Sequence, residues 1–323
     1  MDGSKGQQKM TVGLDLGDKY SYLCLIDQHS GEVMEEGRLR TGPEAFRRRF
    51  ASEQPMRIAI ETGTHSPWAS RVLEECGQEV LVANARKLRL IYANKRKTDE
   101  IDAENLARLA RLARPDPKLL YPLKHRGEEG QAHLTIIRSR QALVGCRTQL
   151  VNHFRGAVKS FGARLPKCPA RSFHKRAAEH IPEALWPSLG PILEHIASLT
   201  QRIRDYERLL ETISKEHYPE TEPMRQVEGI GPLTALTFVL TLEDPYRLEK
   251  SRSVGAYLGL VPATDQSGDR DPQKRISKEG DEMLRKLLVS SAHYILGPFG
   301  SDSDLIPNPV KEFPDHAVWG HQW

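Results

Sequence analysis

The 323-residue sequence predicts an α/β domain at its N-terminal end, followed by regions that are mainly helical. Up to about residue 113, short apolar runs bounded by turn residues alternate with helical patterns. Beyond that point, segments at about 128–161 and 189–217 repeat apolar residues every three or four positions, as long helices do. The composition, 38% hydrophobic and 28% charged, is that of a globular chain with room for two or three cores.

The first segment has an order of strands and helices that indicates its topology. "MTVGLDLG", "YSYLCLID" and "VMEEGRLR" are expected to form an antiparallel meander, because short turns separate these three strands. Next come a helix opening at Pro43, the strand "RIAIE", a helix closed by Gly77, the strand "EVLVAN" and a helix over about 99–113. This is the order of the ribonuclease-H-like fold, in which the first and fourth strands are central neighbours.

Four carboxylates fall at related positions of this fold. Asp15 lies in the first predicted strand, Glu61 ends "RIAIE", and Asp99 and Asp102 start a helix on one side of it. Singly they are an ordinary strand end, an exposed acid or a helix cap beside Thr98. As a set they are expected to converge, which favours hard cations, because clustered carboxylates repel one another without them. We expect two Mg²⁺ ions, replaceable by Mn²⁺, that clamp the attacking and leaving oxygens of a phosphoryl transfer.

The net charge of +4 is unevenly distributed along the chain. Residues 84–98 contain six Lys or Arg and residues 131–178 contain ten, with no Asp or Glu in either stretch. A solvated face normally mixes both signs, so these stretches favour a nucleic-acid surface over a merely soluble basic helix. The side chains expected to contact nucleic acid are Arg86, Lys87, Lys95, Arg96, Lys97, Arg138, Arg140 and Arg147.

The two long helical segments predict a hairpin, and whether it forms within one chain or between protomers stays open. After Pro223, "VEGIGPLTALTFVL" places Gly229 and Gly231 in a tight turn before a helix, where free backbone N–H groups suit a phosphate. This is similar to the helix-hairpin-helix element of DNA-binding proteins, although a plain helix–helix turn has the same pattern.

A polar loop containing Ser267 follows this turn, and it ends in a basic helix start. Taken by itself, Ser267 has the chemistry of an ordinary loop serine. Lys274, Arg275 and Lys278 are further candidate contacts for nucleic acid.

The sequence also predicts a cellular compartment. Its four cysteines stand far apart, without the spacing of a zinc site or a disulfide framework. The start, "MDGSKGQQKM", has no apolar targeting core, and no apolar run reaches the length of a membrane span. We expect an intracellular protein with reduced thiols and no membrane partner.

Five motifs together resemble the insertion-sequence-110 transposases in order and spacing. They are "GLDLG", "AIETGTH", "KTDEIDAENLARL", "VEGIGPLTA" and "YLGLVPATDQSGDRDPQKRISKEGDEMLRKLL". The resemblance covers about residues 10–300. The paired-aspartate motif and the C-terminal pattern are specific, whereas "GLDLG" alone is weak.

The resemblance implies a prokaryotic DNA recombinase in which a coiled coil joins a RuvC-like DEDD domain to a serine-bearing transposase domain. Asp15, Glu61, Asp99 and Asp102 match the DEDD set, and Ser267 matches the nucleophilic serine. The implied partners are donor and target DNA and a structured non-coding bridge RNA. The implied assembly is a dimer to tetramer in which the two catalytic parts meet between protomers, and the implied location is the cytoplasm, at the nucleoid.

Three other functions compete with this one. "GLDLGDKYS" is similar to the first phosphate loop of actin- and sugar-kinase-like ATPases, but their second Asp-Gly-rich loop and adenosine motif are not found. A RuvC-like metal-dependent nuclease or junction resolvase would use water in place of Ser267. A catalytically inactive protein would retain nucleic-acid binding alone.

The predicted organisation has four parts: a DEDD domain at 1–115, a helical spacer at 116–222, a serine-bearing domain at 223–305 and an irregular tail at 306–323. The tail, "IPNPVKEFPDHAVWGHQW", departs from the family pattern. Its prolines remove N–H donors and clash with a preceding helical turn, so it cannot form the expected helix. We expect a frameshifted, truncated or spliced end, with a genuine variant tail as the alternative. We also expect a mobile segment after about Leu305 and an activity lower than that of a full-length relative.

Overall fold

The computed structural model describes residues 10–88, 98–116, 119–244, 248, 250–268 and 270–297. The chain divides into two compact units, Met1–Arg126 and Gly127–Trp323, and each has its own core. No helix within the described ranges combines the length and the apolar character that crossing a bilayer requires.

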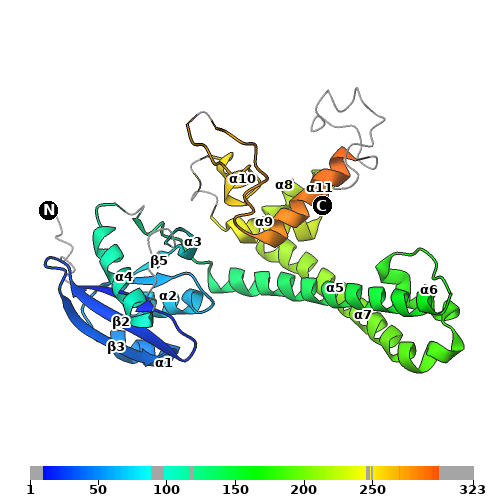
Figure 1. Ribbon diagram of the computed structural model, residues 1–323, viewed down its shortest axis with the longest axis horizontal. Helices are drawn as coiled ribbons and strands as arrows, with labels where there is room; N and C mark the ends of the chain where they lie inside the picture. Colours follow the sequence, from blue (N-terminus) through cyan, green and yellow to red (C-terminus); the bar gives the residue numbers. More distant parts are fainter. Residues whose placement is uncertain are drawn as a thin grey trace. The chain divides into compact units, whose positions relative to one another are not determined.

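The described strands of the first unit form one mixed sheet, drawn in blue to cyan in Figure 1, and their order is β3-β2-β1-β4-β5. The strands are β1 (Met10–Asp15), β2 (Tyr20–Asp27), β3 (Val33–Arg40), β4 (Arg57–Glu61) and β5 (Glu79–Ala83). β1, β2 and β3 are an antiparallel meander, whereas β4 pairs in parallel with both β1 and β5. The predicted meander and the central pairing of the first and fourth strands are therefore confirmed.

Helices cover both faces of this sheet. They are α1 (Pro43–Phe50), α2 (Ser66–Glu75), the short α3 (Ala85–Leu88) and α4 (Asp99–Leu112). Side chains alternate between the two faces of a strand. Val12 and Leu14 of β1 share a core with α1 and α2, and Ala59 of β4 shares another with α4.

Several small residues lie between α4 and the strands, and they allow this helix to lie very close to the sheet. Cys24 and Ile26 of β2 pack against Ala103 and Ala107 of α4. A Cβ atom on Gly13 would lie 1.9 Å from the carbonyl oxygen of Ala103. Helix and strand can therefore touch backbone to backbone at this glycine.

The second unit is built on two long helices, α5 (Glu128–Ser160) and α7 (Trp186–His217). One core joins the last turns of α5 to the first turns of α7, and another joins Leu134 and Ile137 of α5 to Leu210 and Ile213 of α7. The two helices therefore run antiparallel within one chain. The segment between them contains α6 (Phe173–Ala177) and the 3₁₀ turns Ala170–Ser172, Ala178–His180 and Glu183–Leu185.

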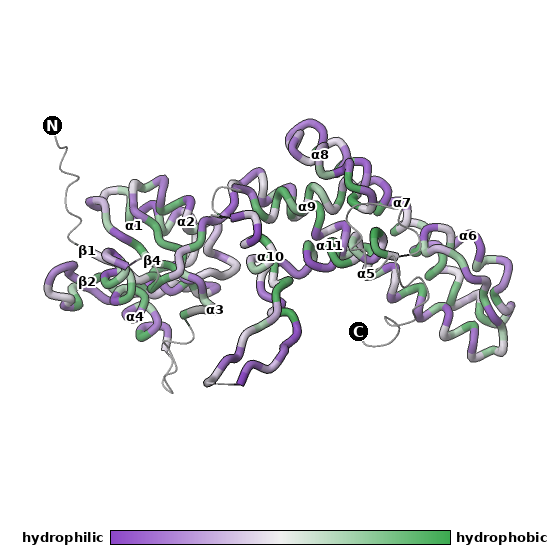
Figure 2. Tube along the Cα trace, turned by 90° about the horizontal axis from the view of Figure 1, so that it is seen from above, coloured by the Kyte–Doolittle hydropathy of each residue, from purple (hydrophilic) through white to green (hydrophobic). Residues whose placement is uncertain are grey.

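Four shorter helices complete the described part of this unit: α8 (Thr221–Arg225), α9 (Pro232–Leu242), α10 (Ser253–Tyr257) and α11 (Glu282–Leu296). α9 is largely hydrophobic and α8 hydrophilic (Figure 2). Leu236 and Leu240 of α9 join the core between Leu134 of α5 and Leu210 of α7. The helix after the Gly229–Gly231 turn is thus fixed to the long helices.

Candidate active site and nucleic-acid interface

Asp15 and Glu61 end two adjacent parallel strands. In the pairing of β1 with β4, Leu14 lies opposite Ile60. The next residue on each strand is a carboxylate, so Asp15 and Glu61 stand side by side at one edge of the sheet. Both are half-buried.

The direction of α4 brings its first turn to the same edge. Ala103 of α4 lies against Gly13, in the middle of β1. At the other end of the helix, Arg111 donates from Nε to the carbonyl of Gln28 and from Nη2 to that of His29, both at 2.9 Å. These carbonyls lie just beyond Asp27, which pairs with Met10 at the start of β1. α4 therefore runs opposite to β1, with its N-terminus towards Asp15.

The two aspartates of this first turn are on the sheet-facing side of α4. Asp99 lies one turn before Ala103, and Asp102 one turn before Leu106, both of which are buried against the sheet. Thr98 caps the helix, its hydroxyl oxygen accepting from the Ile101 N–H at 3.4 Å. The positive end of the helix dipole at this turn stabilises negative charge.

Strand pairing and the direction of α4 bring Asp15, Glu61, Asp99 and Asp102 to a common edge of the first unit, with oxygen atoms as the available ligands. Among the described residues, no three of these carboxylates have ligand atoms within 4.8 Å of one another, so their convergence on one cation stays a prediction. Oxygen ligands from several carboxylates are what Mg²⁺ and Mn²⁺ prefer in proteins. The chemistry of the donor set therefore fits a hard divalent cation.

His65 is a polar residue at this edge to which the sequence interpretation gave no role. It follows Glu61 in the loop after β4, and its Nε2 lies 3.7 Å from Oδ1 of Asp18, in the loop after β1. Trp68 Nε1–H donates to His65 Nδ1 at 3.2 Å, so in neutral imidazole the proton is on Nε2 and faces Asp18. "AIETGTH" contained the histidine, but both of its contacts come from the folded chain.

Ser267 lies at the tip of an exposed ribbon that follows α10. Pro262 is bridged to Ile276, and Ser267 exchanges two backbone hydrogen bonds with Arg270, each 3.1 Å long. The ribbon turns at Gly268, next to Ser267. The serine is exposed, so its hydroxyl is accessible to a large substrate.

The base of this ribbon is held by close backbone contacts. Gly259 and Gly280 both have positive φ, and a Cβ atom on either would lie within 2.3 Å of backbone atoms of the other arm. Below them, the buried Arg285 of α11 donates from Nη1 to the carbonyls of Leu258 at 2.8 Å and Glu279 at 2.7 Å. The ribbon thus has a fixed base and an exposed tip.

The residues near this ribbon that were predicted to contact nucleic acid differ in their interactions and backbone conformation. Lys274 forms an ion pair with Asp265, Arg275 accepts the Ala263 N–H at its carbonyl, and Lys278 has a positive φ of 57°. Gly229 and Gly231 line a shallow pocket with residues of α11, including Ser291 and Tyr294. Whether this turn binds a phosphate stays a prediction.

The predicted basic stretch of α5 is partly engaged in ion pairs. Arg138 lies 3.7 Å from Asp281, and Arg140 pairs with Glu207 of α7. Arg147 is half-buried, and its Nη1 donates to the Thr200 hydroxyl at 3.5 Å.

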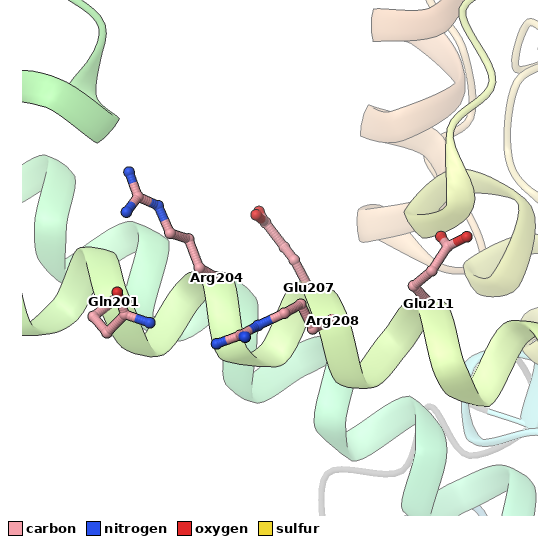
Figure 3. Close-up of a pocket in the computed structure, with 5 residues that line it drawn as sticks. All are labelled: Gln201, Arg204, Glu207, Arg208 and Glu211. Carbon is pink, nitrogen blue, oxygen red and sulfur yellow. The ribbon is translucent and has the colours of Figure 1, made fainter.

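Around Arg147 a positively charged pocket opens between α5, α7 and the turn before α6. Arg147, Arg171, Thr200, Ile203, Arg204 and Glu207 line it. Burial lowers the pKa of Arg147, and repulsion from Arg140 and Arg204 lowers it further, while Glu207 acts against them. Arg204 and Glu207 project to the same side of α7 (Figure 3), where they also line the adjoining surface with Gln201, Arg208 and Glu211. An anion in this pocket would relieve the repulsion.

The remaining predictions fall outside the described residues. They concern Lys95, Arg96, Lys97, the side chains of Arg86 and Lys87, and the tail at 306–323.

Two segments of the chain match family models of transposases. Residues 12–162, which include all four carboxylates, match DEDD_Tnp_IS110, a family model for transposases. Residues 222–298, which include Ser267, match the family model described as "Transposase IS116/IS110/IS902 family". The two matches define an insertion-sequence transposase with a DEDD domain.

Similar proteins extend over most of the chain. It is 30% identical to "Putative transposase y4pF/y4sB" of Sinorhizobium fredii over 301 residues, which are 90% of this chain and 73% of that protein. It is 29% identical to the transposase for insertion sequence element IS1328 of Yersinia enterocolitica over 289 residues, 87% and 82% of the two chains. A "Probable family 20 transposase" of Pseudomonas aeruginosa is 27% identical over 292 residues, 88% and 83%. The chain belongs to the IS116/IS110/IS902 family of transposases, which confirms the family that the motifs indicated.

Proposed function

We propose that this transposase cuts and rejoins DNA through a covalent bond to Ser267, with Mg²⁺ held by Asp15, Glu61, Asp99 and Asp102. The observation that supports the proposal is that β1 and β4 end, and α4 begins, at one edge of the first unit, which directs these four acids to the same side. The all-oxygen donor set suits a hard cation. When bound, such a cation supplies charge stabilisation for oxygens at the reacting phosphate.

The reaction exchanges one phosphate ester for another. Ser267 Oγ loses its proton and attacks the phosphorus, the Oγ–P bond forms, and the bond from phosphorus to the 3′ oxygen breaks. That oxygen takes up a proton and leaves as a 3′-OH, so the 5′ phosphate stays on the serine. A second 3′-OH then attacks this phosphoserine and releases Ser267. No ATP is needed, because each step forms the kind of bond that it breaks.

The proposed partners follow from charge and exposure. Donor and target DNA are the substrates. The bridge RNA is held in part by the pocket of Arg147, Arg171 and Arg204, which contains more guanidinium groups than carboxylates. Ser267 stands at an exposed tip, so it can reach a carboxylate set on another protomer of a dimer or tetramer. The proposed location is the prokaryotic cytoplasm.

Trapping the covalent intermediate tests this function. Protein, RNA, Mg²⁺ and 5′-phosphate-side-labelled DNA are incubated and quenched in denaturant, and the label is expected to migrate with the protein. Ser267→Ala should abolish the adduct while binding persists, whereas Thr264→Ala, an exposed hydroxyl of the same ribbon, should retain it. Cleavage without any adduct in the wild type would show that water is the nucleophile.

A further inference from the structure

A second cluster of metal-ligating side chains lies in the other unit, where α5 begins and α7 ends. Glu129 and His133 are four residues apart on one side of α5, and His217 is the last residue of α7. Each offers one ligand atom, and these atoms lie within 4.8 Å of one another. Glu129 Oε1 is 2.8 Å from His217 Nδ1, and the two imidazole rings have centroids 5.1 Å apart.

A fourth side chain orients one of the imidazoles. The hydroxyl of Tyr218 lies 2.9 Å from His133 Nδ1. If Nδ1–H donates to the phenol oxygen, the lone pair of Nε2 is available to a ligand. Histidines that bind metals usually hold their other ring nitrogen in such a hydrogen bond.

The local field also favours a cation. The carboxylates of Glu129, Glu220 and Glu243 interact electrostatically with Tyr218 and so add negative charge beside the cluster. Glu243 is held in place by the Gly127 N–H, which donates to its Oε1 at 2.7 Å. Carboxylates therefore gather where α5, α7 and α9 meet, and their negative charge favours a cation there.

We propose that Glu129, His133 and His217 bind a late first-row divalent cation, represented by Zn²⁺, that clasps the start of α5 to the end of α7. Two imidazoles and one carboxylate are a familiar zinc donor set, and water completes the tetrahedron. Imidazole nitrogen selects Zn²⁺ over Mg²⁺, so this site differs in chemistry from the all-oxygen carboxylate set. Ligand atoms in tetrahedral zinc sites are roughly 3.3 Å apart, given bonds of about 2.0–2.1 Å, so small rotations of exposed side chains suffice.

Solvent reaches the cluster, which makes loading and removal of the ion measurable. The side chains of Glu129 and His217 are 66% and 44% exposed. Without a metal, the same atoms form a hydrogen bond between the carboxylate and a protonated or Nδ1-protonated histidine. The experiment must distinguish this hydrogen bond from metal ligation.

The test uses the full chain with its affinity tag removed and bound metal stripped by a chelator. Zn²⁺ is titrated in competition with a chromophoric chelator into wild type, His217→Gln and Glu129→Gln. His195→Gln, an exposed histidine of α7 outside the cluster, is the matched control. We expect wild type and control to bind one equivalent more than the two variants, or to bind that equivalent at least about tenfold more tightly.

Thermal unfolding supplies an independent readout. Zn²⁺ should raise the unfolding temperature of wild type and His195→Gln, because an ion that binds the folded state alone stabilises it, and it should leave His217→Gln unchanged. Mg²⁺ should not reproduce the shift. Equal zinc binding by wild type and His217→Gln, or a destabilisation by His217→Gln that is the same in chelator and in Zn²⁺, would overturn the proposal. Ser267→Ala should keep the zinc affinity, so the test of this site is independent of the test of the proposed reaction.

Discussion

The carboxylate edge of the first unit and the Ser267 ribbon of the second are built in opposite ways. Asp15 and Glu61 end central strands of a sheet, and the helix of Asp99 and Asp102 lies against a glycine of that sheet. Ser267 stands on an irregular ribbon whose bridges are isolated pairs. Ligands that share a cation need fixed positions, and regular elements supply them. A group that attacks a large substrate needs access, which the exposed tip supplies.

The largest effect is expected when one carboxylate of the first unit loses its charge. Asp102→Asn keeps the shape of the side chain but loses its charge, so strand exchange in Mg²⁺ should fall by on the order of a thousandfold or more, equivalent to several kcal/mol of metal stabilisation. RNA binding should persist. Glu104→Gln, which removes a surface ion pair with Arg108 on the same helix, should retain activity. Normal recombination by Asp102→Asn would refute the metal role.

The second test moves the carboxylates without changing them. Gly13→Ala would put a Cβ 1.9 Å from the Ala103 carbonyl oxygen, so α4 must shift away from β1. Overpacking of this kind costs about 1–3 kcal/mol, occasionally more. We expect a lower unfolding temperature and recombination reduced at least about tenfold.

Gly37→Ala is the matched control for that variant, because Gly37 lies in the same sheet with no atom within 4 Å of the added Cβ. Its effect on activity should be small. If Gly13→Ala recombines as well as Gly37→Ala, the contact between α4 and β1 does not position the aspartates.

The regular strands and helices could be predicted from the sequence. "YSYLCLID", "VMEEGRLR" and "RIAIE" are predicted as strands and form β2, β3 and β4 over those residues, because local alternation and turn residues determine short strands. The helix predicted at about 128–161 is α5. α7 begins at Trp186, a few residues before the expected start, because Pro187 is tolerated in a first helical turn.

Contacts between distant segments could not be predicted in this way. The Arg140–Glu207 pair and the approach of His65 to Asp18 each join residues far apart in the sequence. The Glu129, His133 and His217 cluster depends on the antiparallel alignment of two long helices, and the sequence alone left open whether they pair within one chain. The four carboxylates could be proposed as a site because the strands and the helix that carry them were predicted. The proposed role of Ser267 rests on the resemblance to a family.

The third test loosens the base of the ribbon. Arg285→Leu removes the donors to the Leu258 and Glu279 carbonyls, and each buried unsatisfied group costs about 1–3 kcal/mol. The unfolding temperature should fall, and the yield of the Ser267 adduct should fall with it. Lys286→Leu, one residue on, loses an exposed pair with Glu282 and should change stability little. An unchanged adduct yield in Arg285→Leu would show that the tip acts independently of its base.

The smallest expected effect concerns the basic pocket between α5 and α7. Replacing Arg147 and Arg204 together by Gln should reduce the slope of log affinity against log salt by about 0.7–0.9 for each phosphate that the variant no longer neutralises. Arg208→Gln on the same helix is the control, because that exposed side chain pairs with Asp205. Salt-dependent binding of the RNA, measured for both variants, is the readout.

The same double variant separates binding from structure. Burial and repulsion from Arg140 and Arg204 lower the pKa of Arg147, so in the absence of an anion its charge opposes folding. Replacing Arg147 and Arg204 should therefore leave the unfolding temperature of the free protein unchanged or higher, while RNA stabilises the variant less than it stabilises the wild type. If the salt slope stays the same and the free protein is destabilised, these arginines hold the α5–α7 hairpin together and do not bind phosphate.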